Sequence, residues 1–272
     1  MKDAEYKTKF QPIPCAGIIF FTLYTVYAFL NDTQWHVYCT VVGFFTIGLL
    51  DDIGKIVNGS HISYISGKKR FLLEILFSSV FAYFFLQGHN YDILVIGKII
   101  TIPYFLAFFI IIFLIVGTAN AVNLTDGHDG LAGTVILLNL LFILMVAGFS
   151  SIVLALIVSL LAFLLFNSKP ATIYMGDSGS MFFGSLLAIL FIEAKAEHLL
   201  PITGFVFVFE TVSVILQVLY FKATKGKRIF KMAPFHHHLS LSGVQDEKIV
   251  SIAFVTTSLL CLCVYCIFYV VS

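Results

Sequence analysis

The sequence predicts an all-α, polytopic membrane protein. Apolar residues make up 60% of the 272-residue chain and charged residues 11%, and the mean hydropathy is +1.00. Soluble domains are only about half apolar and carry about a quarter charged residues. A run such as FLAFFIIIFLIVG at 105–117 lacks the period-two alternation of a membrane β-strand. We therefore expect one integral-membrane domain over residues 1–272, built from helices.

Nine apolar stretches approach the length of about 20 residues that a helix needs to cross a bilayer. They lie approximately at 13–31, 35–50, 70–87, 102–122, 131–149, 151–167, 179–193, 202–221 and 249–271. The chain starts with MKDAEYKTKFQPIP, which mixes acidic with basic residues and lacks a small-residue cleavage site. The first stretch is therefore expected to be a permanent span rather than a signal peptide.

The basic residues predict the orientation. With nine spans and the N-terminus inside, fourteen of the sixteen lysines and arginines fall on inner segments, and only Lys98 and Lys195 fall outside. Basic residues stay on the cytoplasmic side of short loops, so the predicted topology is N-in and C-out. Charged residues and histidines are also concentrated in the inner segments 51–69, 123–130, 168–178 and 222–248. We therefore expect the functional site on the cytoplasmic face, and a net charge of +1 gives no support to nucleic-acid binding.

Carboxylates gather at the predicted inner ends of the spans. Five of the nine aspartates lie there: Asp51, Asp52, Asp126, Asp129 and Asp177. Partly buried carboxylates need compensating charge. A hard divalent cation supplies it, and Mg²⁺ binds through one or two carboxylates together with substrate phosphates. The pattern therefore favours a magnesium site that faces a pyrophosphate.

Each motif also has a purely structural interpretation. The pair Asp51-Asp52 is compatible with a charged helix end, and NLTDGHDG at 123–130 with a helix-ending turn and a cap. In MGDSGS, Asp177 or Ser178 could cap the following helix, a role compatible with phosphate binding because helix N-termini attract anions. Chance placement of all these strings on one membrane face is the weaker explanation.

Two further features are histidines and an intramembrane carboxylate. His236, His237 and His238 are consecutive, so they point to different faces of a helix and cannot form a three-ligand zinc site unaided. We expect them to contact an anionic substrate as hydrogen-bond donors. Glu210 lies in the middle of the 202–221 span with Gln217 on the same helical face. Because it is expected far from the inner face, we predict an interhelical hydrogen bond for Glu210.

Four strings together resemble one family. LLDD (49–52), AVNLTDGHDGLAG (121–133), NSKPATIYMGD (167–177) with the following SGS, and ETVSVILQVLYFKATKGKRIFKMAPFHHHL (210–239) are similar to the polyprenyl-phosphate N-acetylhexosamine-1-phosphate transferases. The last string resembles the muramoyl-pentapeptide branch. The resemblance implies that UDP-N-acetylmuramoyl-pentapeptide and undecaprenyl phosphate give lipid I and UMP with Mg²⁺, in peptidoglycan synthesis. It also implies a multi-pass protein of the bacterial inner membrane, in contact with membrane lipid, and a homodimer.

The resemblance also implies residue roles. Asp177 is the first expected Mg²⁺ ligand and Asn123 the second. The pair Asp51-Asp52 is expected to handle the lipid phosphate, one of them removing its proton. Lipid phosphate is expected to attack directly, although a covalent aspartyl intermediate stays open. The remaining expected site residues line the nucleotide-sugar pocket or contact phosphate and sugar: Asp126, Asp129, Asn167, Tyr174 (stacked on uracil), His236, His237, His238, Arg70 and Lys69.

The chain departs from the family pattern in three places. Arg70 and Glu74 stand where a lysine and a glutamine are expected, unless Lys69 or Lys68 takes the place of that lysine. PIPCAGI at 12–18 replaces a Thr-Pro-Thr-Met-Gly-Gly stretch, so substrate contacts there, including one from Lys9, are not carried over. Nine spans replace the usual ten, the missing one preceding Lys2. An alternative is therefore a related transferase that uses UDP-N-acetylglucosamine for teichoic acid or another surface polymer. A transporter is disfavoured because, apart from Glu210, the spans are nearly free of charge.

Overall fold

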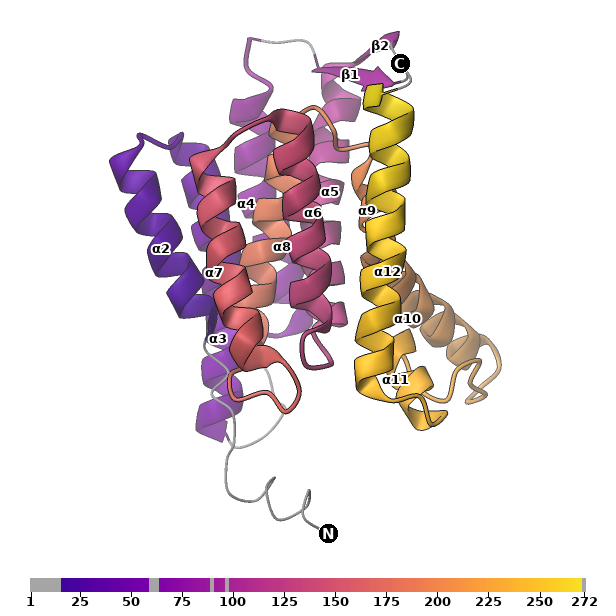
Figure 1. Cartoon of the computed structure of the whole chain (residues 1–272). Helices are drawn as coiled ribbons and strands as arrows, with labels where there is room; N and C mark the ends of the chain where they lie inside the picture. The colour runs from indigo at the N-terminus through magenta and orange to yellow at the C-terminus, as the bar shows by residue number, and fades with distance from the viewer. Residues whose placement is uncertain (1–15, 59–63, 89–90, 96–97, 271–272) are drawn as a thin grey trace.

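The computed structural model, which describes residues 16–58, 64–88, 91–95 and 98–270, is a bundle of helices that run up and down beside one another (Figure 1). The elements are α2 (Ala16–Leu30), α3 (Trp35–Asn58), α4 (Gly67–Phe85), β1 (Tyr91–Val95), β2 (Lys98–Ile102), α5 (Tyr104–Thr125), α6 (Leu131–Ala147), α7 (Ser151–Asn167), α8 (Gly176–Glu193), α9 (Leu200–Thr203), α10 (Phe205–Ala223), α11 (Phe235–Leu241), α12 (Asp246–Tyr265) and the π-helix η1 (Cys266–Val270).

Every predicted span contains a helix, which confirms the helical membrane architecture. Among the described helices, five are long and apolar enough to cross a membrane: α3, α5, α8, α10 and α12. The apolar helices α2, α6 and α7 are shorter, with 15, 17 and 17 residues. The count of nine spans and the N-in, C-out orientation stay predictions.

Helix α8 is the centre of the bundle. It is buried from Ser178 to Ile192 and packs against α2, α3, α5 and α6. Glycines permit this close approach, since a methyl group on Gly48 of α3 would overlap the backbone of Asp177, and one on Gly184 would overlap Ala119 of α5. Small residues at helix contacts let membrane helices pack backbone to backbone. The first turn of α8 is therefore held directly against α3.

Two elements differ from the predictions. Helix α3 does not end near residue 50 but continues to Asn58, so Asp51 and Asp52 lie inside a helix, 0% and 1% exposed. Strands β1 and β2, which lead into the predicted span 102–122, pair antiparallel, with Tyr91 opposite Ile102. The strands YDILV and KIITI are rich in β-branched residues, which favour a sheet. The all-α prediction is wrong for this short segment.

The segments rich in charged residues and histidines meet at one end of the bundle. Figure 1 shows the C-terminal end of α3, the α5–α6 loop, the α7–α8 loop and α11 at that end. The β1–β2 hairpin and the C-terminal end of α12 lie at the opposite end. The predicted grouping of the acidic strings and the histidines is therefore reproduced in the fold.

Candidate active site

Asp52 links α3 to the first turn of α8. Its two carboxylate oxygens accept the backbone N–H groups of Asp177 and Ser178, both at 2.9 Å. These amides have no partner within their own helix, because the first turn of any helix leaves its N–H groups free. The alternative interpretation, in which Asp177 or Ser178 caps this helix, therefore does not hold. Neither side chain makes a cap bond, and the amides are bound by a residue of another helix.

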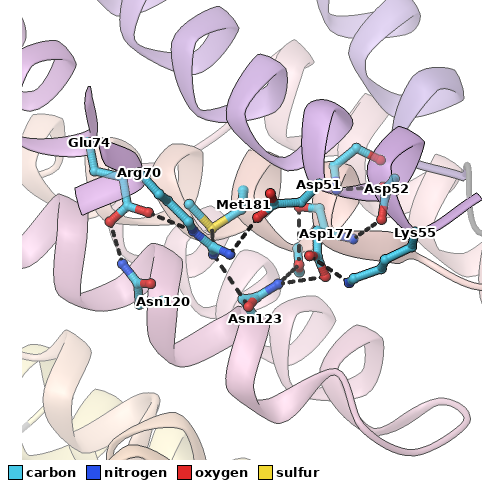
Figure 2. Close-up of polar contacts among 11 residues, drawn as sticks. Asp51, Asp52, Lys55, Arg70, Glu74, Asn120, Asn123, Asp177 and Met181 are labelled. Atoms are coloured by element: carbon cyan, nitrogen blue, oxygen red, sulfur yellow. Dashed lines mark hydrogen bonds and ion pairs between the residues drawn. The ribbon is translucent and has the colours of Figure 1, made fainter. Parts of the chain in front are cut away.

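Arg70 connects two buried carboxylates (Figure 2). Its Nη1 donates to Asp51 Oδ2 at 2.9 Å and its Nε to Glu74 Oε1 at 3.0 Å, while Nη2 lies 3.4 Å from Asn123 Oδ1. Asn120 donates to the other Glu74 oxygen at 2.6 Å. The guanidinium fork can hold two carboxylates in a fixed geometry, which a lysine cannot. The two residues that depart from the family pattern, Arg70 and Glu74, are thus paired with each other.

Asp177 faces a lysine that the sequence analysis did not single out. Lys55 Nζ lies 2.7 Å from Asp177 Oδ2. Asn123 donates through Nδ2 to Asp177 Oδ1 at 3.2 Å and to Ser180 Oγ at 2.9 Å. Lys55 follows Asp52 by three residues, a spacing that places both on one helical face. Continuing the predicted helix beyond residue 50 would have found it.

An open cavity of about 730 Å³ lies beside Asp177. Its lining residues are Asp52, Lys55, Asp126, Gly127, His128, Asp129, Asn167, Tyr174, Gly176 and Asp177. Four carboxylates thus face one ammonium group. Burial, followed by repulsion from Asp177 and Asp52, raises the pKa of Asp126 to about 7. The cavity has an excess of negative charge.

Asn167 and Asp129 hold two loops together at this cavity. Asn167 accepts the N–H of Gly130 at 2.9 Å and donates to the carbonyl of Ile173 at 2.9 Å. Asp129 Oδ2 accepts the N–H of Ala171 at 3.1 Å. Both side chains therefore fix the loop 126–130 against the segment 168–175. Tyr174 lies at the rim, 41% exposed.

The histidines separate into two groups. The ring of His236 packs against the rings of His237 and of His128, a residue that the sequence analysis did not single out. His238 turns away, because its Nδ1 accepts the N–H of Lys231 at 3.1 Å and its ring packs against Phe230 and Phe235. Only two of the three consecutive histidines therefore lie near the acidic cavity.

Glu210 lies closer to these histidines than predicted. Both of its oxygens accept the N–H of His236 at 3.2 Å, so the expectation that it lies far from the inner-face motifs is wrong. Gln217 accepts the N–H groups of Ile229 and Phe230 at 3.0 Å. The segment after α10 folds back along it, and these two polar side chains hold it there. The predicted structural role of Glu210 thus joins α10 to α11.

The remaining positions named from the sequence are Lys69, Lys9 and the string PIPCAGI. Lys69 is exposed in the first turn of α4 and makes no hydrogen bond or ion pair with the described part of the chain. Lys9 and residues 12–15 of PIPCAGI lie outside the described residues. The rest of that string begins α2, where the N–H groups of Ala16 and Gly17 approach the carbonyls of Tyr174 and Met175 at 3.3 Å.

The residues around Asp177 fit a magnesium ion. The Lys55 ammonium already places a positive charge against Asp177, so the position accepts a cation. The surrounding acidic oxygens are the hard donors that Mg²⁺ prefers. Asn123 approaches Asp177 through its nitrogen. Its amide would have to rotate before Oδ1 could serve as a second ligand.

Comparison with known proteins decides the family. Residues 34–195, from the start of α3 to the loop after α8, match glycosyl transferase family 4. The chain belongs to this family. Relatives named phospho-N-acetylmuramoyl-pentapeptide-transferase include one from Rickettsia bellii, 39% identical over 86% of this chain and 72% of its own length. Another, from Nautilia profundicola, is 38% identical over 90% of this chain and 78% of its own length.

The family assignment confirms the resemblance predicted from the four strings. The glycosyl transferase family 4 match contains the acidic residues from Asp51 to Asp177 and ends before the histidines of α11. Family membership and the apolar helices together make the chain a multi-pass membrane transferase of phosphosugars.

Proposed function

We propose that this chain is a phospho-N-acetylmuramoyl-pentapeptide transferase, which transfers the phosphosugar of UDP-N-acetylmuramoyl-pentapeptide to undecaprenyl phosphate and gives lipid I and UMP. The observation that carries the proposal is the acidic cavity at the helix ends, where Asp52, Asp177 and Lys55 converge. The names of the relatives support the donor and the product. We place the enzyme in the bacterial cytoplasmic membrane, with the cavity on the inner face.

The charge of the cavity supports a requirement for Mg²⁺. A diphosphate substrate is an anion, and four carboxylates with one ammonium would repel it unless a cation were added. Asp177 would hold that ion, joined by Asn123 once its amide has rotated. When bound, Mg²⁺ would neutralise charge on the diphosphate and make UMP a better leaving group.

Asp51 and Asp52 differ in what they can do for the lipid phosphate. Both oxygens of Asp52 are engaged by the α8 amides, so Asp52 positions Asp177. Asp51 keeps Oδ1 without a partner among the described residues while Arg70 holds Oδ2. Asp51 is thus the member of the pair with a carboxylate oxygen left for a proton, whereas Asp52 is the member that lines the cavity. A phosphate oxygen is already an adequate nucleophile, and direct attack then needs only positioning.

Lys55 and Tyr174 suit the nucleotide end of the donor. Lys55 is 38% exposed in its side chain, so it can leave Asp177 and pair with a diphosphate oxygen. Tyr174 exposes its ring at the rim of the cavity and can stack on uracil.

The test is UMP release by purified protein in detergent. UMP should appear only when UDP-N-acetylmuramoyl-pentapeptide, undecaprenyl phosphate and Mg²⁺ are all present. The variant Asp177→Ala should lower the rate by a factor on the order of 100 or more, the loss typical of removing a charge-stabilising group. UMP release without the lipid, or full turnover by Asp177→Ala, would contradict the proposal.

The departure at Arg70 and Glu74 is the reason to test one alternative donor. An arginine binds phosphate with a different geometry from a lysine. In this structure the Arg70 guanidinium is paired with Asp51 and Glu74. The alternative is a transferase that uses UDP-N-acetylglucosamine for teichoic acid or another surface polymer. Presenting both nucleotide sugars in parallel assays separates the two functions, because only the preferred donor should give UMP at the full rate.

A further inference from the structure

Three imidazole rings from two separate segments meet beside the acidic cavity. His128 comes from the α5–α6 loop, and His236 and His237 come from α11. The ring centroids lie 4.7 Å apart for His128 and His236, 5.3 Å for His128 and His237, and 4.2 Å for His236 and His237. One ring nitrogen of each residue lies within 4.8 Å of those of the other two. The cluster thus brings three potential metal ligands together.

His236 is the buried member of the cluster. It is 0% exposed, and neither ring nitrogen makes a hydrogen bond with the described residues. Nδ1 lies 3.2 Å from Glu210 Oε2, without hydrogen-bond geometry, and Nε2 faces Gly127, where a methyl group would overlap it. Buried polar atoms without partners are rare, and each one calls for a ligand or another explanation. The Nε2 lone pair is thus directed toward the loop that carries His128.

The hydrogen bonds of Ser240 define the tautomer of His128. Ser240 Oγ donates its one hydrogen to Asp246 Oδ1 at 2.7 Å, so it can only accept from His128 Nε2, which lies 3.0 Å away. Lys169 holds the other oxygen of Asp246 at 3.0 Å. Neutral His128 therefore carries its hydrogen on Nε2, which leaves the lone pair on Nδ1. A histidine oriented through its second nitrogen in this way is typical of metal ligands.

We propose that His128, His236 and His237 bind a transition-metal ion of the Zn²⁺ class at a site separate from that of Mg²⁺. Imidazole nitrogens select zinc, cobalt and nickel, whereas carboxylate oxygens select magnesium. Glu210 behind His236 and Asp246 behind Ser240 supply the carboxylates that commonly stand behind metal-bound histidines. The site does not depend on which nucleotide sugar the transferase uses.

The protonation state and the geometry of the rings are compatible with this role. Burial, followed by the neighbouring His236, lowers the pKa of both His128 and His237, so these rings are neutral near pH 7 and can act as ligands. Tetrahedral zinc with bonds of about 2.1 Å separates its ligand nitrogens by about 3.4 Å. Nitrogens within 4.8 Å of one another reach that spacing by small side-chain rotations. A bound ion would tie the loop 126–130 to α11 at one side of the cavity.

The experiment is a Co²⁺ titration of full-length protein without a histidine tag, in detergent and millimolar Mg²⁺. One equivalent should bind with the intense visible absorption of four-coordinate cobalt, and Zn²⁺ should displace it. His128→Gln should weaken binding at least 100-fold. The matched control is His238→Gln, a neighbouring histidine outside the cluster, which should bind within about threefold of the unaltered chain.

Two further variants separate this site from others. Ser240→Ala keeps all three ligands but releases the orientation of His128, so affinity should fall by about 10–100-fold. Asp177→Asn should leave the cobalt spectrum unchanged even though it removes the proposed Mg²⁺ ligand. Each variant is compared only if its size-exclusion profile and its melting temperature in chelator match those of the unaltered chain.

The proposal is overturned by a weak, six-coordinate cobalt spectrum, by equal losses in His128→Gln and His238→Gln, or by loss of the spectrum in Asp177→Asn. Failure of UMP release would instead contradict the transferase function and leave the cobalt result unaffected.

Discussion

At the residue scale, Arg70 and Glu74 form an ion pair. Glu74 and Asp51 are almost fully buried, and each has one oxygen on the Arg70 guanidinium. Removing one partner of a buried ion pair leaves an uncompensated charge, which destabilises a protein by about 3–5 kcal/mol. The two departures from the family pattern are therefore expected to depend on each other.

A double-variant comparison tests that dependence. Arg70→Lys should lower the apparent melting temperature in detergent, because one ammonium cannot reach both Asp51 and Glu74 in the guanidinium geometry. Adding Glu74→Gln should restore part of the loss, with a coupling of about 0.5–3 kcal/mol. Lys69→Met, at the exposed neighbouring position, serves as the control and should melt like the unaltered chain. Additive losses in the double variant would refute the coupling.

The pKa of Asp126 predicts how the stability of the protein depends on pH. Its pKa in the folded protein is about 7 and its usual value is 3.8. Between these values the folded chain binds more protons than the unfolded chain, so stability falls as the pH rises from about 4 to about 7. Asp126→Asn cannot lose a proton, so in chelator it should melt above the unaltered chain at pH 8 and near it at pH 4.

Adding Mg²⁺ checks the comparison between Asp126→Asn and the unaltered chain. Added Mg²⁺ favours the charged carboxylate, and it should therefore reduce the advantage of Asp126→Asn at pH 8. The variant should also release UMP more slowly, because a destabilising charge at a functional site is retained for its chemistry. An advantage of Asp126→Asn that is the same at pH 4 and pH 8 would show that the charge is not responsible.

At the element scale, the contact between α3 and α8 positions the site. Gly48 lets the α8 backbone at Asp177 approach α3, and Asp52, one turn further along α3, accepts the first α8 amides. Helix packing and the placement of Asp177 therefore depend on the same few residues.

Gly48→Ala should separate these two helices. The added methyl group would overlap the Asp177 backbone, which cannot move as a flexible side chain can. Overpacking of this kind destabilises by about 1–3 kcal/mol, and UMP release should fall further than the melting temperature alone explains, because Asp177 is displaced. Gly67→Ala is the matched control, since nothing lies within 4 Å of a methyl group there. Equal activity in the two variants would refute the positioning role of Gly48.

The sequence predicted the helices better than their ends. Hydropathy measures the transfer of a segment into lipid. It located a helix in each predicted stretch but placed the end of α3 eight residues early. The charges of Asp51 and Asp52 lower the hydropathy of that segment. Their compensation comes from Arg70 and from the α8 amides, which are remote in sequence. Local propensity cannot register partners of this kind.

The sequence predicted that the acidic residues meet at one place, but not which other residues join them or how they contact one another. The acidic residues from Asp52 to Asp177 do line one cavity. Lys55 was missed because the predicted helix stopped before it. Glu210 was placed wrongly because the segment after α10 folds back along the helix, and periodicity carries no information about such a return. The prediction for the string NLTDGHDG covered its acidic residues but not His128.

At the scale of the whole molecule, the chain alternates direction from one long helix to the next. The acidic cavity and α11 lie at one end of the bundle, and the hairpin lies at the other (Figure 1). Lys195 follows α8 at the end of the bundle away from Asp177, as the prediction for an outer loop requires. The two ends of the bundle thus differ as the predicted topology requires, and the cytoplasmic position of the cavity stays a prediction.

Labelling of single cysteines tests that orientation. In a chain whose five cysteines are replaced by serine, Asp32→Cys lies in the exposed turn between α2 and α3, and Lys227→Cys lies in the exposed segment after α10. A membrane-impermeant maleimide should label Asp32→Cys in cells with an intact inner membrane but label Lys227→Cys only after that membrane is permeabilised. The reason is the positive-inside rule, which retains the lysine-rich segment 222–231 in the cytoplasm. The reverse pattern would place the acidic cavity outside, where no UDP-sugar is available, and would refute both the topology and the proposed donor.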